Sequence, residues 1–138
     1  MGIAALITWL LTAVGGFVLL GTWIAKGGAR QPTTTHLPPP VVFGHFVLAV
    51  VGLVVWIVYL VVDSESLAWI AFALLVPVAV LGFTMLARWL PVYRDRTTTT
   101  QTAPAERHFP VGVVAGHGVF AVVTVVLVLL TALGVGGN

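Results

Sequence analysis

The segment His36-Leu-Pro-Pro-Pro-Val-Val-Phe-Gly-His45 returns later in the chain as His108-Phe-Pro-Val-Gly-Val-Val-Ala-Gly-His117. Each copy leads into a long apolar run, and the two copies together hold all four histidines of the protein. Histidine, glycine and proline recur at equivalent positions, and such matches are harder to obtain by chance than matches of valine or alanine. We therefore interpret the chain as two repeats, residues 1–63 and 64–138, within a single membrane domain of residues 1–138.

The rest of the sequence is dominated by apolar runs. Hydrophobic residues make up 59% of the 138 residues and charged residues only 7%, whereas about a quarter of a soluble domain is charged. Four runs exceed the ~20 residues that cross a hydrocarbon core of ~30 Å. The sequence thus predicts an all-α integral membrane protein, a four-transmembrane-helix bundle built from two parallel repeated helical hairpins. The runs are Ile3–Ala25, Val41–Val62, Leu67–Leu90 and Val111–Val135.

The positive charges indicate how the chain lies in the bilayer. Lysine and arginine occur only in or beside the first and third connections, whereas the second connection, Asp63-Ser-Glu-Ser66, carries acids alone. The positive-inside rule places the basic connections in the cytoplasm. We expect a multi-pass protein of the plasma membrane with both termini outside and the histidines toward the cytoplasm. The basic residues are Lys26, Arg30, Arg88, Arg94, Arg96 and Arg107.

The composition excludes several classes of site and partner. The chain has no cysteine, which rules out disulfides, thiolate metal sites, iron–sulfur clusters and covalently attached c-type haem. A net charge of +2 is too small for the electrostatic footprint of a nucleic-acid-binding protein, so no nucleic acid is expected as a partner. The acids all lie in connections, where we expect solvated charges. They are Asp63, Glu65, Asp95 and Glu106.

His45 and His117 lie several residues inside the second and fourth apolar runs. An imidazole at that depth must be paired or hydrogen-bonded, and such residues are functional candidates. One interpretation is a hydrogen bond to a backbone carbonyl or hydroxyl that tightens helix contacts. The other is a ligand shared by the two helices, which the matched repeat positions favour. Two facing imidazoles supply both axial positions of a haem b iron, and electron transfer is then the expected function.

Other residues are candidates for holding such a cofactor. Arginine pairs strongly with carboxylates, so Arg30 and Arg107 are candidates for binding haem propionates. His36 and His108 precede proline-containing helix starts, where they could bond propionates, ligate a second cofactor, shuttle protons or simply be solvated. The five tryptophans fall mostly near the ends of the spans, where we expect interfacial anchoring. Small residues on the histidine faces leave room for a flat ligand or for close helix packing; they are Ala49, Gly52, Ala121 and Thr124.

The pattern resembles the four-helix membrane cytochromes b, such as cytochrome b561 cores. The resemblance rests on four spans, on His45 and His117 in spans two and four, and on the flanking arginines. It implies bis-histidine ligation of haem b and an electron carrier or binding protein rather than a catalyst with its own substrate. That family generally carries a second histidine pair near the opposite face, and this sequence has none there. The Val, Ala, Gly and Arg bias also looks like that of small four-span proteins of high-GC actinobacteria.

Two other functions are compatible with the sequence. Copper, zinc or iron bound by some of the four imidazoles would make the chain a transition-metal binding or transport protein. Alternatively, the chain is a non-enzymatic accessory or assembly subunit of a larger membrane complex, and the histidines hold its helices together. The lipid bilayer is the expected partner in every case. A redox partner protein, a larger membrane complex and a second copy of the chain are further candidates.

Overall fold

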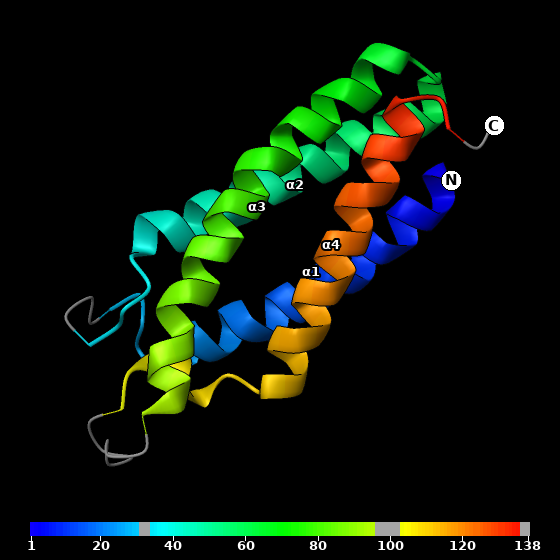
Figure 1. The fold of residues 1–138 in the computed structure, drawn as a ribbon. Helices are drawn as coiled ribbons and strands as arrows, with labels where there is room; N and C mark the ends of the chain where they lie inside the picture. Colours follow the sequence, from blue (N-terminus) through cyan, green and yellow to red (C-terminus); the bar gives the residue numbers. More distant parts are fainter. Residues whose placement is uncertain (31–33, 96–102, 136–138) are drawn as a thin grey trace.

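The computed structural model describes residues 1–30, 34–95 and 103–135, which form four long α-helices and one short 3-10 helix (Figure 1). All four α-helices are long and apolar enough to cross a membrane. The predicted four-helix membrane bundle is therefore confirmed. The elements are α1 (Gly2–Ala25), α2 (Pro39–Val62), α3 (Glu65–Arg94), η1 (Ala105–His108) and α4 (Val111–Ala132).

Local sequence explains where α2 and α4 begin and where α2 ends. Pro38 precedes α2 in an extended conformation, and proline at the first helical positions removes no intrahelical hydrogen bond. Pro110 precedes α4 in the same way. At its other end α2 stops at Asp63, whose φ of 53° is left-handed and whose amide donates to the Tyr59 carbonyl at 2.7 Å. The chain therefore turns directly from α2 into α3.

Helix α3 is longer than its apolar run. We predicted a run over Leu67–Leu90 and a connection from Pro91 onward, but α3 continues through Pro91 for another turn. The guanidinium of Arg107 donates to the carbonyls of Val92, at 2.7 Å, and Asp95. A cation at a helix C-terminus bonds the last carbonyls and interacts favourably with the helix dipole. This contact with the following connection supports the additional turn.

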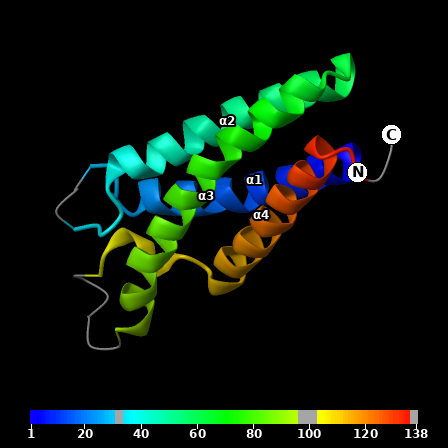
Figure 2. The ribbon, with the colours of Figure 1, turned by 45° about the horizontal axis from the view of Figure 1, so that its top comes forward.

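The four helices pack as a ring in the order α1, α2, α3 and α4 (Figures 1 and 2). The most extensive contacts join α2 to α3 and α4 to α1, and α2 and α4 lie on opposite corners of the ring. Exchanging α1 with α3 and α2 with α4 reproduces the same pairs of neighbouring helices, although α3 and α4 pack more extensively than α1 and α2. This is the arrangement expected of two hairpins related by a two-fold axis along the bundle.

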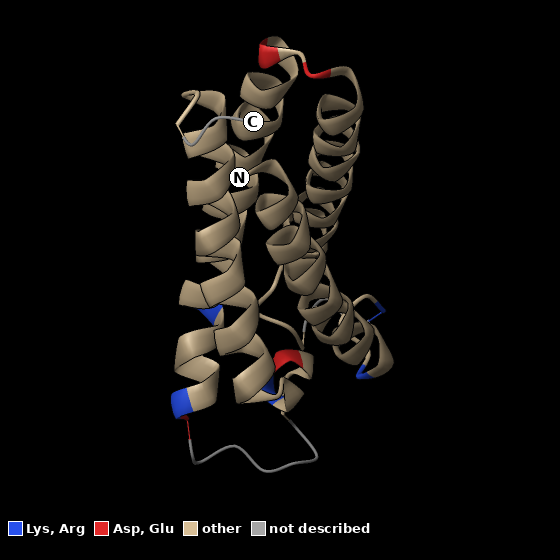
Figure 3. Cartoon of the chain, turned by 90° about the vertical axis from the view of Figure 1, so that its right-hand side faces the viewer, with Lys and Arg blue, Asp and Glu red and all other residues tan. Residues whose placement is uncertain are grey.

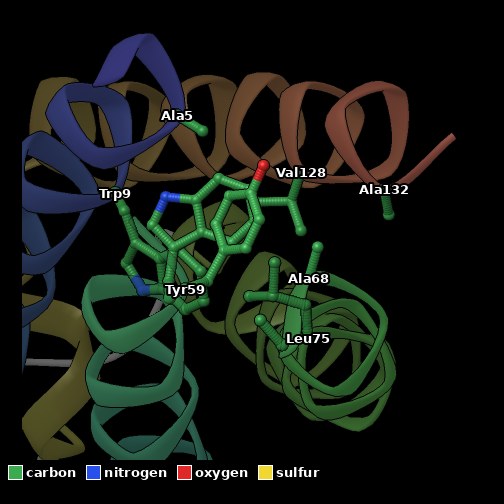
Figure 4. Packing of buried hydrophobic residues seen from close by; sticks show 9 residues of the cluster. Ala5, Trp9, Tyr59, Ala68, Leu75, Val128 and Ala132 are labelled. Carbon is green, nitrogen blue, oxygen red and sulfur yellow. The ribbon is translucent and has the colours of Figure 1, made fainter. Parts of the chain in front are cut away.

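Buried side chains form a cluster at each end of the bundle. We call the end with the α2–α3 turn and both termini the turn end, and the opposite end the connection end. Four of the five tryptophans are buried, so interfacial anchoring is wrong for Trp9, Trp23, Trp56 and Trp89. The turn-end cluster (Figure 4) contains Ala5, Trp9, Trp56, Tyr59, Ala68, Ala71, Leu75, Val128 and Ala132. The connection-end cluster contains Trp23, Leu37, Val42 and Ala105.

Charged residues also divide between the two ends (Figure 3). Asp63 and Glu65 lie at the turn end, where α2 passes into α3. The lysine and arginine residues of the described chain lie at the connection end. Arg96 lies outside the described residues. Asp95 and Glu106 also lie at the connection end. The apolar middle of the bundle thus separates an end that holds the described lysine and arginine residues from an end where Asp63 and Glu65 lie, as expected of a protein that crosses a bilayer.

Candidate functional site

His45 on α2 and His117 on α4 meet across the centre of the bundle. Their ring centroids lie 6.3 Å apart, and the ring planes are inclined at 55°. Both side chains are half-buried, and they come from the two helices that occupy opposite corners of the ring. The structure therefore brings the two candidate ligands together.

One nitrogen of each ring is held by a neighbouring helix. Nδ1 of His45 lies 2.9 Å from the Val78 carbonyl on α3, and Nδ1 of His117 lies 2.8 Å from the Thr12 carbonyl on α1. A carbonyl can only accept, so Nδ1 is the donor in both cases, and Nε2 of the neutral ring keeps its lone pair. In metal sites a carbonyl commonly orients a histidine in this way while the other nitrogen binds the metal.

Glycines on α1 and α3 allow the rings to lie against these helices. A β-carbon on Gly82 would lie 3.3 Å from Cε1 of His45, and one on Gly16 would lie 3.2 Å from Cε1 of His117. Each glycine follows its carbonyl-bearing residue by four positions, so it stands one helical turn beyond the carbonyl that holds the ring. A larger residue at either position would press on the imidazole.

His45 and His117 have equivalent partners because α1 and α3 also share a repeated segment. Gly16-Phe-Val-Leu-Leu-Gly-Thr-Trp23 on α1 matches Gly82-Phe-Thr-Met-Leu-Ala-Arg-Trp89 on α3 at its glycine, phenylalanine and tryptophan. The histidine repeat does not reveal this match, because the α3–α4 connection is longer than the α1–α2 connection and the two repeats therefore have different offsets. A search for separate repeats in the first and second helices of each hairpin would have found it.

The histidines occupy a layer between the two buried clusters. At this level none of the described helical residues is fully buried, although residues above and below it are. Protein side chains thus close the bundle at its ends but cover the histidine layer only in part. The layer comprises the residues between Trp9 and Trp23, between Val42 and Gly52, between Val78 and Trp89, and from Val111 to Val123.

Two of the small residues that follow the histidines on their own helices pack elsewhere. A β-carbon on Gly52 would lie 3.2 Å from the ring of Trp9, and the hydroxyl of Thr124 lies 3.0 Å from that of Thr8. Both contacts belong to the close packing of α2 and α4 on α1. Of the two interpretations, close helix packing is therefore the one that holds for Gly52 and Thr124, and room for a ligand is not found at these two residues.

His36 belongs to a hydrogen-bond network around Glu106 at the connection end. Glu106 is 0% exposed, and its carboxylate accepts from the Thr35 hydroxyl at 2.7 Å and from the His36 amide at 2.6 Å. Nδ1 of His36 lies 3.1 Å from Oε1 of the same carboxylate. We expected Glu106 to be solvated; this is wrong, because protein donors replace water around it. The indole of Trp23 on α1 donates to the Thr35 hydroxyl at 3.0 Å and connects α1 to the network.

The other predicted cofactor-binding residues have different surroundings. His108 is exposed, and its Nδ1 lies 3.3 Å from the Ala105 carbonyl in its own turn. Arg107 bonds the end of α3, as described above, and Arg30 is exposed. Arg88, which we did not select as a site residue, donates to the His36 carbonyl at 3.2 Å. The repeat-related histidines at the connection end are therefore not equivalent in structure.

Among the described residues, no three histidine, aspartate or glutamate side chains gather as they would to hold a metal ion. Structural and catalytic zinc sites use three or four protein ligands, whereas a porphyrin supplies four nitrogens and needs only axial ligands from the protein. Comparison with protein-family models, with curated proteins and with solved structures finds no match. The geometry of the site itself must therefore indicate its chemistry.

Proposed function

We propose that the protein binds one haem b in the membrane, with His45 and His117 as its axial ligands, and that it transfers electrons. The distance of 6.3 Å between the two ring centroids carries the proposal. Two metal–nitrogen bonds of ~2.0–2.1 Å in line, with each ring centre about 1 Å behind its nitrogen, place the ring centres about 6 Å apart. We include in this proposal that the protein is similar to the four-helix membrane cytochromes b.

The surroundings of the rings orient both imidazoles for a shared ligand. Each Nδ1 is occupied by a carbonyl, which leaves Nε2 to bind iron. Gly16 and Gly82 let the rings lie against α1 and α3, which keeps both imidazoles in place for such a ligand. Arg88, which donates to the His36 carbonyl at the connection end, is the candidate there for pairing with the carboxylates of the cofactor.

Electron transfer is the activity that suits this ligation. Two axial histidines leave no open position on the iron for oxygen or a substrate, so the bound haem would supply a one-electron couple within the bilayer. The partner that exchanges electrons with it would be a redox protein or a larger membrane complex, and this function requires no catalytic activity of the protein itself. A second copy of the chain is a further candidate partner.

A role as an accessory subunit of a membrane complex is the second candidate function. The bond of His45 to Val78 ties α2 to α3, and the bond of His117 to Thr12 ties α4 to α1. Hydrogen bonds between spans stabilise helix association without any cofactor. In this case both imidazoles have a structural role, and the chain would copurify with larger subunits.

The optical spectrum of protein purified in detergent after haem supplementation tests the main proposal. We expect about one haem per chain and the spectrum of low-spin, six-coordinate iron, because both axial positions are filled. Elemental analysis of the same sample provides the control. Copper or zinc without porphyrin would select a metal-ion protein instead. Absence of both, in protein that keeps its helical circular dichroism, would contradict haem binding and favour the accessory role.

We further propose that the protein lies in the plasma membrane with its connection end in the cytoplasm and both termini outside. The basic residues at the connection end support this orientation. Because the chain has no cysteine, single cysteine variants can be labelled without background. A membrane-impermeant maleimide should label Ser66→Cys in intact cells and Ala29→Cys only after permeabilisation. The reverse pattern would invert the orientation.

A further inference from the structure

Glu106 is a buried carboxylate that haem ligation does not use. Removing an ionised carboxylate from water is costly unless hydrogen bonds and an opposite charge compensate it. Three donor atoms reach its oxygens, two of them from His36 and one from Thr35. Of these partners, His36 alone can acquire a positive charge. The pair therefore has the composition of a site that stores a proton.

His36 is fixed in position but open to solvent. Its amide bonds Glu106, its carbonyl accepts from Arg88, and its Nδ1 lies beside Oε1 of Glu106. The side chain is nevertheless 63% exposed. An imidazole that a carboxylate orients on one side and that is open to water elsewhere can exchange a proton with the solvent.

The other charged groups near the pair are engaged with backbone atoms. Arg88 contacts His36 through its carbonyl, and Arg107 bonds the carbonyls of Val92 and Asp95 at the end of α3. Arginine keeps its proton throughout the physiological range. His108, two residues after Glu106, is directed to the Ala105 carbonyl. Within this network, His36 and Glu106 are thus the pair in which an imidazole lies beside a carboxylate and can share a proton with it.

We propose that His36 and Glu106 form a proton-binding site at the connection end, which takes up a proton from water when the haem between His45 and His117 is reduced. The coupling rests on the proposed haem site; the proton site does not. Reduction by an external one-electron donor adds one negative charge at the haem, and one proton adds a positive charge at the pair. His36 precedes His45 by nine residues. Because opposite charges attract, reduction raises the affinity of the pair for its proton, and the bound proton makes the haem easier to reduce.

Redox titration of the haem at several pH values tests the coupling. In the wild type, the haem should become harder to reduce as pH rises, because the compensating proton becomes scarce. His36→Asn places an amide near the position of Nδ1 but cannot take up the proton, so the pH dependence should be lost. Glu106→Gln should also remove it. His108→Asn, at the repeat-related position, should retain it.

Equal pH dependence in the wild type and His36→Asn would overturn the coupling, as would its loss in His108→Asn. Thermal unfolding and the haem spectrum of each variant show whether the connection end has remained folded. A separate readout does not need haem: the ring resonances of ¹⁵N-labelled histidine follow protonation of His36 directly. Glu106→Gln should change the His36 titration, whereas His108→Asn should not. An identical titration in Glu106→Gln would overturn the proton site, even in protein that carries no haem.

Discussion

Replacing His45 or His117 by alanine is expected to abolish six-coordinate haem in the purified protein. The two rings lie 6.3 Å apart across the bundle, and each would supply one axial bond, so neither can replace the other. Loss of a residue that merely orients a metal ligand costs 10–100-fold in affinity. We therefore expect loss of a ligand itself to weaken haem binding by about 100-fold or more, measured by titration of haem into detergent-solubilised protein.

Asparagine variants separate ligation from helix packing in this experiment. The side-chain amide of His45→Asn can still donate to the Val78 carbonyl, and that of His117→Asn to Thr12, but neither side chain binds haem iron through an imidazole. If the histidines are ligands, asparagine should preserve thermal stability better than alanine and still fail to give the low-spin spectrum. His108→Ala is the matched control and should bind haem normally. A wild-type spectrum in both asparagine variants would exclude His45 and His117 as ligands.

The fold was predictable because its main determinant is local. Each apolar run is longer than the hydrocarbon core is thick, and Pro38 and Pro110 mark helix starts in a way that the structure retains. The end of α3 was not predictable from hydropathy. The helix continues past Pro91 in contact with Arg107, a residue of the following connection. A contact of this kind cannot be predicted from the hydropathy of the span.

The candidate site was predictable only in part. The repeat placed His45 and His117 at equivalent depths, and the structure brings them together. Their partners could not be inferred in the same way, because Gly16 and Gly82 belong to other helices and recur at a different offset. Burial of Glu106 depends on two connections that are distant in sequence and meet only in the folded bundle. Composition alone therefore misassigned it as a solvated acid.

Leucine at Gly16 or Gly82 is expected to displace a histidine ring and to weaken haem binding about tenfold or more. Even a β-carbon would lie 3.2 Å from Cε1 of His117 or 3.3 Å from that of His45, which is already closer than usual contact. The additional carbon atoms of leucine must push the imidazole away from the carbonyl that holds it. Overpacking of this kind costs ~1–3 kcal/mol, and haem titration measures the resulting loss of affinity.

Gly118→Leu is the matched control, because nothing lies within 4 Å of a β-carbon at that position although it is adjacent to His117. This variant should bind haem with wild-type affinity, and all three should keep the helical circular dichroism of the parent. Loss of binding in Gly118→Leu as well would indicate general intolerance of bulk in the bundle. Unchanged affinity in both Gly16→Leu and Gly82→Leu would show that the rings need not be held against α1 and α3, and the proposed orientation of Nε2 toward the iron would then lose its structural basis.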